Sequence, residues 1–224
     1  MKRWSLGGAV ALLLTCTSAL AQDRIVVLGD SVMTWNALRR GAVADVLART
    51  LDRPVENRAV SGARFSHDTG IARLFGLDIR TQFDFAPTEW VVMTGGANDL
   101  RAECGCVSCS ETLDGLISAD GRTGEVPEFV ARVAASGARI VWVLYYDSPE
   151  GPPTPFTACR GAFDELDARL DRLARIVPAL TLADAGPLID PATAADYAPD
   201  RIHPSVDASR RIGRLVAGII AASP

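Results

Sequence analysis

Continuous apolar runs alternate with helically spaced apolar residues along most of this chain. The runs that indicate buried strands cover residues 25–28, 89–94 and 139–146, and shorter strands are expected at 54–60 and 180–183. Helical spacing is found over residues 36–51, where the stripe starts at Leu38, over 126–133 and 163–177, and after Pro204. Strands that are apolar throughout and alternate with helices are typical of a parallel sheet covered on both faces. The pattern therefore predicts an α/β fold, a three-layer α/β/α sandwich around a five-stranded parallel sheet.

Two segments do not fit this alternation. Residues 68–83 are loosely helical but interrupted by Gly70 and Gly76. Residues 101–124 show little periodicity and contain three of the cysteines, so we expect a long loop there. Loops of that length usually have a function or are pinned by cross-links.

The first 21 residues have the features of a cleavable signal peptide. Lys2 and Arg3 form a basic start, residues 7–14 are apolar, and residues 19–21 end in a small-x-small cleavage site. The apolar part is too short to span a bilayer. Cys16 resembles the modified cysteine of a lipoprotein only faintly. We therefore expect a secreted or periplasmic protein, with residues 22–224 forming a single domain.

The charge composition narrows the possible partners and chemistry. Removing Lys2 and Arg3 from the 23 basic residues leaves 21 against 27 acidic ones, a formal charge of −6. No basic patch is present to bind phosphates, so we expect no nucleic-acid partner. Lys2 is the only lysine, which excludes a P-loop lysine, a Schiff base and a Ser-Lys pair from the mature chain.

Four cysteines remain after export, namely Cys104, Cys106, Cys109 and Cys159. An even number in an exported protein favours disulfides, with one local bridge and one that reaches Cys159. The individual pairing stays open. A metal site is the competing interpretation, but the fourth cysteine lies 50 residues away and an oxidising compartment disfavours free thiolates.

Polar residues follow several of the predicted strands, at the sheet edge where ligands bind in α/β proteins. Ser31 follows the first strand, Gly62 the second, Asn98 the third, and Asp200 and His203 precede the last helix. Acyl transfer needs a nucleophile, a base, an orienting acid and donors for an oxyanion. Ser31, His203 and Asp200 are candidates for the first three roles. The backbone N–H groups of Ser31 and Gly62, with the Asn98 amide, are candidate oxyanion donors.

Each candidate also has a purely structural interpretation. Asn98 is a common turn residue, Asp200 is able to cap the last helix, His203 is able to lie on an exposed loop, and Gly62 is a common turn glycine. Their joint occurrence in this order, each at a strand-end loop, favours the catalytic interpretation over independent coincidence.

The chain resembles the SGNH (GDSL-type) hydrolase superfamily in four blocks that cover most of the mature sequence. These blocks stand as Gly29-Asp-Ser-Val32, Asn57-Arg-Ala-Val-Ser-Gly62, Gly96-Ala-Asn-Asp99 and Asp200-Arg-Ile-His203. The resemblance implies a catalytic Ser31, the Asp200–His203 acid and base, oxyanion donors at Gly62 and Asn98, and a flavodoxin-like strand order of 2-1-3-4-5. Val32 replaces the usual leucine, and the cysteine-bearing segment is not part of the family pattern.

We therefore expect an exported, monomeric serine esterase that acts on a small-molecule or glycan ester without a cofactor or metal. One alternative is a catalytically silent module of the same fold that binds glycans or acyl chains. Another is a thiol or metal protein built on the cysteine cluster.

Overall fold

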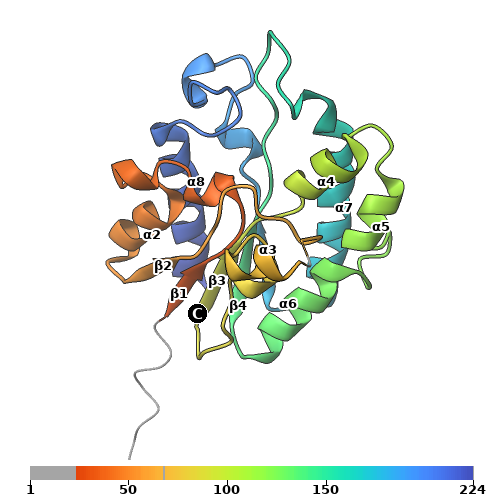
Figure 1. Cartoon of the computed structure of the whole chain (residues 1–224). Helices are drawn as coiled ribbons and strands as arrows, with labels where there is room; N and C mark the ends of the chain where they lie inside the picture. The colour runs from red at the N-terminus through yellow and green to blue at the C-terminus, as the bar shows by residue number, and fades with distance from the viewer. Residues whose placement is uncertain (1–23, 68, 224) are drawn as a thin grey trace, which may run out of the picture.

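The computed structural model describes residues 24–67 and 69–223 and contains one five-stranded sheet (Figure 1). The strands are β1 (Ile25–Val27), β2 (Val55–Asn57), β3 (Trp90–Met93), β4 (Arg139–Val143) and β5 (Leu180–Ala183). All neighbouring strands are parallel and their order is β2-β1-β3-β4-β5. The predicted sheet and its strand order are thus confirmed. The predicted signal peptide lies outside the described residues.

Helices cover both faces of the sheet. They are α1 (Ser31–Thr34), α2 (Val43–Leu51), α3 (Gly70–Leu74), α4 (Ala97–Cys104), α5 (Ser110–Leu116), α6 (Glu125–Ala135), α7 (Arg160–Ile176) and α8 (Val206–Ala222). Short 3₁₀ helices are η1 (Ala37–Arg39), η2 (Ile79–Thr81), η3 (Thr157–Cys159), η4 (Gly186–Leu188) and η5 (Ala194–Asp196). Helices α2 and α8 pack together on one side, and α4 to α7 lie on the other (Figure 1). No helix within residues 24–67 and 69–223 is long and apolar enough to cross a membrane.

The end of β1 is fixed by a close approach to the end of β3. Gly29 has φ +120°, and a Cβ atom there would lie 2.5 Å from the Thr94 carbonyl oxygen. The buried Gln82 side chain accepts from the Gly29 N–H at 2.6 Å and donates to its carbonyl at 3.0 Å. Only glycine fits this position, so the chain turns directly from the sheet into α1.

Helix α8 begins one residue later than the sequence suggested. Ser205 is its N-cap and accepts from the Ala208 N–H, so Pro204 lies just outside the helix. Of the five apolar residues that make its helical spacing, Ile212, Val216 and Ile220 are buried. The other two, Leu215 and Ile219, pack at the margin of the core and stay partly exposed.

The single helix expected over residues 36–51 is wrong at its start. Asn36 and Arg40 both have positive φ and flank η1, and α2 follows only at Val43. Leu38, assigned to the buried stripe, is fully exposed, with a relative accessibility of 104%. The apolar spacing correctly indicated α2, but the left-handed conformations of Asn36 and Arg40 prevent the helix from starting earlier.

The long loop expected over residues 101–124 is also wrong. The second half of α4 and all of α5 fall there, and the two helices bury Leu100, Leu113 and Leu116. Each helix has too few turns to give a visible stripe, and Gly105 in the left-handed region separates them.

Candidate active site

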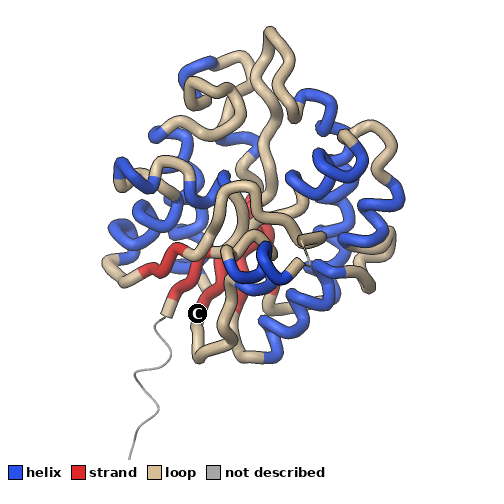
Figure 2. The backbone as a smooth tube through the Cα atoms, in the orientation of Figure 1, coloured by secondary structure: helices blue, strands red, loops and turns tan. Residues whose placement is uncertain are grey.

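Ser31 is the first residue of α1, directly after the turn that ends β1. Asp30 is the N-cap, and its Oδ1 accepts from the Val32 N–H at 3.0 Å. This bond satisfies one of the backbone donors that a helix start leaves free. Ser31 therefore sits at the carboxyl edge of the sheet, on a backbone fixed from both sides. The loops at this edge form the upper part of Figure 2.

The Asp30 carboxylate joins the Ser31 loop to two other segments. It is buried, and its Oδ2 accepts from the Tyr145 hydroxyl at 2.6 Å. The same hydroxyl accepts from the Ala97 N–H at 3.3 Å, beside Asn98. Burial raises the pKa of Asp30, and the bonds from Tyr145 and Val32 oppose that rise. Sequence reasoning gave Asp30 no role, because its partner Tyr145 is 115 residues away.

The candidate base and acid lie together on the loop before α8. His203 Nδ1 is 2.5 Å from Asp200 Oδ2, and Asp200 Oδ1 accepts from the N–H groups of Ile202 and His203. Burial alone would raise the pKa of Asp200, but the hydrogen bonds from His203 and the backbone lower it below the ordinary value. The acid therefore stays ionised at neutral pH, and its Oδ2 is placed to orient the His203 ring through Nδ1.

Two aromatic residues hold this loop. The Trp35 ring stacks on His203, with centroids 3.7 Å apart and an angle of 10° between the planes. The Tyr146 hydroxyl donates to the Ile202 carbonyl at 2.9 Å. Trp35 and Tyr146 lie far from this loop in the sequence. Their spacing gave no signal for the stack on His203.

The candidate oxyanion donors come from the loop after β2 and from α4. Asn98 Nδ2 donates to the Ala63 carbonyl at 3.2 Å, which holds the residue next to Gly62 against α4. Gly62 has φ +81° and is exposed, with no atom within 4 Å of the position that a Cβ would take. The Gly62 backbone is thus open to an approaching oxygen.

Ser31, Asn98 and His203 line one cavity of about 40 Å³ at the carboxyl edge of the sheet. Its apolar wall is formed by Val32, Ala97, Phe156, Phe163 and Ile202, and Tyr145 and Tyr146 complete it together with polar groups of Asp30, Asp147 and Ser148. Gly62 and Asp200 are not among its lining residues, and Asp200 contacts the cavity only through His203. Within the described residues, the Ser31 and His203 side chains share this cavity without a direct hydrogen bond.

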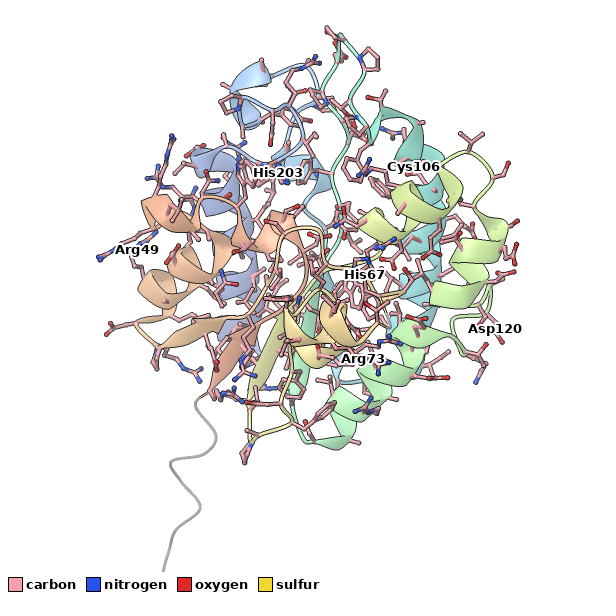
Figure 3. All side chains as sticks on the ribbon, in the orientation of Figure 1. Arg49, His67, Arg73, Cys106, Asp120 and His203 are labelled. Carbon is pink, nitrogen blue, oxygen red and sulfur yellow. A yellow bond between two sulfur atoms is a disulfide. The ribbon has the colours of Figure 1, made fainter. Side chains whose placement is uncertain are left out.

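The second histidine, His67, lies outside this cavity. It hydrogen bonds to the Arg64 guanidinium and to the Leu77 carbonyl at 3.2 Å. Figure 3 shows His67 and His203 well separated, with His67 on the side of Arg73. His67 is therefore a structural residue of the loop before α3.

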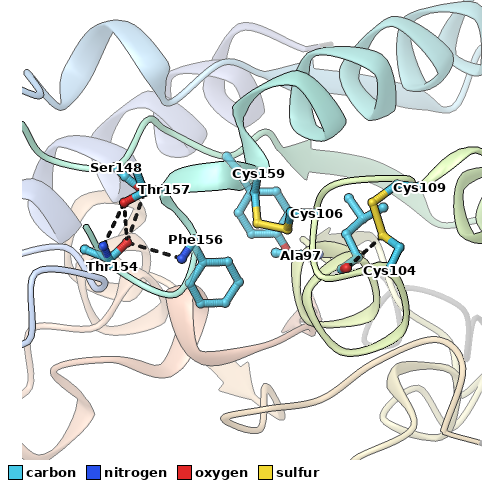
Figure 4. The surroundings of a disulfide bond; sticks show 11 residues. Ala97, Cys104, Cys106, Cys109, Ser148, Thr154, Phe156, Thr157 and Cys159 are labelled. Carbon is cyan, nitrogen blue, oxygen red and sulfur yellow. Dashed lines mark hydrogen bonds between the residues drawn. A yellow bond between two sulfur atoms is a disulfide. The ribbon is translucent and has the colours of Figure 1, made fainter.

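The four cysteines form two disulfides, one local bridge and one that reaches Cys159, as the sequence suggested. The pairs are Cys104–Cys109 and Cys106–Cys159. The second bridge ties the turn between α4 and α5 to η3, close to the wall residue Phe156 (Figure 4). With all four sulfurs paired, none of these residues is a thiolate for metal binding.

The comparisons place this geometry in a known group. Residues 27–211 match the family model described as the GDSL-like lipase/acylhydrolase family. The chain belongs to this family, whose members are SGNH hydrolases that act on esters. A comparison with curated proteins finds no match.

Solved structures show the same fold at low sequence identity. A protein assigned as an SGNH hydrolase from Slackia heliotrinireducens is 21% identical, with a TM-score of 0.58 over 88% of this chain and 98% of that one. The carbohydrate acetylesterase Est24 from Sinorhizobium meliloti is 16% identical, with a TM-score of 0.61 over 89% and 98%. The psychrotrophic esterase EstA from Pseudoalteromonas sp. is 17% identical, with a TM-score of 0.57 over 89% and 97%.

Proposed function

We propose that this chain is an exported serine esterase that cleaves short-chain carboxylic esters through an acyl-enzyme. The observation that carries the proposal is the hydrogen-bonded Asp200–His203 pair, whose imidazole lines the same small cavity as the Ser31 side chain. No other pairing of the chain's two histidines with a carboxylate is found beside a serine within residues 24–67 and 69–223.

The proposed reaction has two halves. Ser31 Oγ attacks the ester carbonyl while His203 takes its proton, and Asp200 orients the imidazole and stabilises its charge. The N–H groups of Ser31 and Gly62 and the Asn98 amide stabilise the oxyanion, each by roughly 3–4 kcal/mol. His203 then gives the proton to the leaving alcohol, and water attacks the acyl-enzyme by the same route in reverse. No metal or cofactor is required.

The size of the cavity supports a short acyl group. The cavity has a volume of about 40 Å³. An acetyl group is of that size, whereas a long fatty chain is not. Est24, which shares the fold, is described as a carbohydrate acetylesterase, and that activity agrees with a preference for a short acyl group.

The test compares the proposed nucleophile and the proposed base with a control variant at the second histidine. We expect Ser31→Ala and His203→Ala to abolish hydrolysis of p-nitrophenyl acetate, and His67→Ala to retain it because His67 lies outside the cavity. Wild type should react with a fluorophosphonate probe and Ser31→Ala should not. An unlabelled wild type without hydrolysis would favour the catalytically silent binding module instead.

The pH profile gives a second test. A histidine base must be neutral, so activity should fall below pH of about 6 to 7. Because the pKa of Asp200 is lowered, its protonation should not contribute to this fall. Activity that stays level down to pH 4 would contradict the assignment of His203 as base.

We also propose that residues 1–21 direct export and that residues 22–224 act as a monomeric single domain. Two disulfides support an oxidising compartment. Fractionation of a Gram-negative host that expresses the full chain should recover the shortened protein in the periplasm or medium, and removal of residues 1–21 should retain it in the cytoplasm. Light scattering of the purified protein tests the monomer.

A further inference from the structure

A second, larger hollow adjoins the catalytic residues on the side of Trp35. Its volume is about 590 Å³, compared with about 40 Å³ for the cavity that contains Ser31. We name it the Trp35 groove. It is lined by Thr34, Trp35, Asn36, Ala37, Leu38, Arg39, Ser61, Tyr197, Ala198, Pro199, Ser205 and Val206.

The groove is built from the chain neighbours of four candidate catalytic residues. Trp35 follows Ser31 by four residues, Ser61 precedes Gly62, Pro199 precedes Asp200, and Ser205 follows His203 by two. Trp35 itself stacks on His203. His203 therefore lines the small cavity and contacts Trp35, which lines the groove.

We propose that the Trp35 groove binds the alcohol half of the ester, a bulky alcohol with a flat apolar face. This inference rests on the proposed function. An ester has two halves, and the small cavity shared with Asn98 accommodates only a short acyl group. His203 must protonate the leaving alcohol oxygen, so the alcohol lies on the histidine side. The groove that shares Trp35 with that histidine is the space available there.

The lining indicates the chemistry of the alcohol. Trp35, Ala37, Leu38, Pro199 and Val206 present apolar surface, and an indole ring is suited to contact with a flat ring. The polar groups of Arg39 and Ser61 lie among them and are suited to hydroxyl groups. Both an aryl alcohol and the apolar face of a sugar ring share this chemistry.

The exposed Leu38 supports a binding role for the groove. Its relative accessibility is 104%, and the flanking Asn36 and Arg40 have φ of 70° and 50°. Asn36 Nδ2 holds this backbone by donating to the Pro204 carbonyl at 3.1 Å and to Ser209 Oγ at 3.0 Å. A strained backbone that projects a leucine into solvent is costly and persists where the surroundings fix it, as at ligand-binding loops.

The experiment varies the alcohol while the acetyl group stays the same. The substrates are ethyl acetate, 1-naphthyl acetate and a mono-acetylated methyl glucoside. The variants are Leu38→Ser, which removes apolar contact, and Ala37→Glu, which places a charged chain in the groove. Leu74→Ser is the matched control, because Leu74 is also exposed (79%) but belongs to α3, outside the groove.

We expect both groove variants to lower kcat/KM for a bulky acetate by about tenfold, with less than about a twofold change for ethyl acetate. The Leu74→Ser variant should match wild type on all three substrates. Loss on 1-naphthyl acetate alone identifies an aryl alcohol, and loss on the glucoside identifies a sugar. Equal losses on ethyl and bulky acetates, or no loss on either bulky acetate, would overturn the inference.

Failure of this inference is distinguishable from failure of the proposed function. Labelling of Ser31 by a fluorophosphonate and hydrolysis of ethyl acetate by wild type do not depend on the groove. If both are observed but the groove variants show no selective loss, the groove inference alone is wrong. If neither is observed, both proposals are wrong.

Discussion

The hydroxyl of Tyr145 provides the sharpest test of how the Ser31 loop is held. Tyr145→Phe removes the 2.6 Å bond to the buried Asp30 carboxylate and the acceptor for the Ala97 N–H. The ring remains, so its stacking on Phe163 at 5.1 Å is preserved. The change therefore isolates one oxygen atom that joins the nucleophile loop to α4.

The expected cost follows from the charge of the partner. A hydrogen bond to a charged group contributes about 1.5–3 kcal/mol, and we expect a loss of about 2 kcal/mol at pH 8. For a domain of this size that loss corresponds to a decrease in Tm of about 4–8 °C. Hydrolysis should also slow, through kcat more than KM, because the backbone of Ser31 loses its support.

The loss should depend on pH in one direction. Burial raises the pKa of Asp30 and the Tyr145 hydroxyl opposes that rise, so removal of the hydroxyl would let the pKa rise further. When the pKa of a carboxyl is higher in the folded than in the unfolded state, the protein loses stability as pH rises from the unfolded pKa through the folded pKa. The deficit of the variant should therefore be larger at pH 8 than at pH 4.

The matched control is Tyr146→Phe. Tyr146 is also buried at the end of β4, but its hydroxyl donates to a neutral carbonyl, that of Ile202. We expect a loss of about 1 kcal/mol without pH dependence. Thermal unfolding of both variants from pH 4 to pH 8 makes the comparison. Equal, parallel losses in the two variants would refute the role assigned to the Asp30 charge.

Three further changes test the fold. Burial, with Asp184 and Asp164 nearby, raises the pKa of Asp167 to about 7. Asp167→Asn should therefore stabilise the protein by about 1–2 kcal/mol at pH 8, after allowance for solvent screening, and by little at pH 4. Denaturant unfolding measures this, and an equal gain at both pH values would contradict it. Replacing Cys106 and Cys159 by alanine opens a bridge across 53 positions and should cost about 4 kcal/mol in the same assay; a loss below about 1 kcal/mol would contradict the constraint. Gly29→Ala should destabilise by more than about 2 kcal/mol, because its Cβ has no space; a wild-type Tm would refute that packing.

The sheet was predictable mainly because its three central strands, β1, β3 and β4, are apolar runs that are almost wholly buried. Residues 25–28 and 90–94 are buried on both faces of the sheet, so nearly all of their side chains are apolar, and the sequence shows this directly. Helices α4 and α5 were not predictable in the same way. Each buries only a few side chains, and cysteines and Gly105 interrupt the spacing, so the pattern resembles that of a loop.

The candidate site was predictable where its groups are close in sequence. Asp200 and His203 are three residues apart, so the local backbone alone is able to bring their side chains within hydrogen-bond distance. The sequence also carried the order of the strand-end residues. Contacts between distant segments could not be predicted from the sequence in this way. The stack of Trp35 on His203 and the bond between Tyr145 and Asp30 join positions more than 100 residues apart, and no spacing rule reports them.

The short distance between Asp200 and His203 along the chain has a mechanical consequence. One loop carries as a unit both groups to which we assign the proton transfer, and Arg201, with φ of 59°, provides the bend between them. Displacement of that loop would change the separation of base and nucleophile while leaving the acid–base pair intact. Its anchors are the Tyr146 hydroxyl and the Trp35 ring. In the proposed mechanism, the distance between His203 and Ser31 is thus set by this one loop and its two anchors.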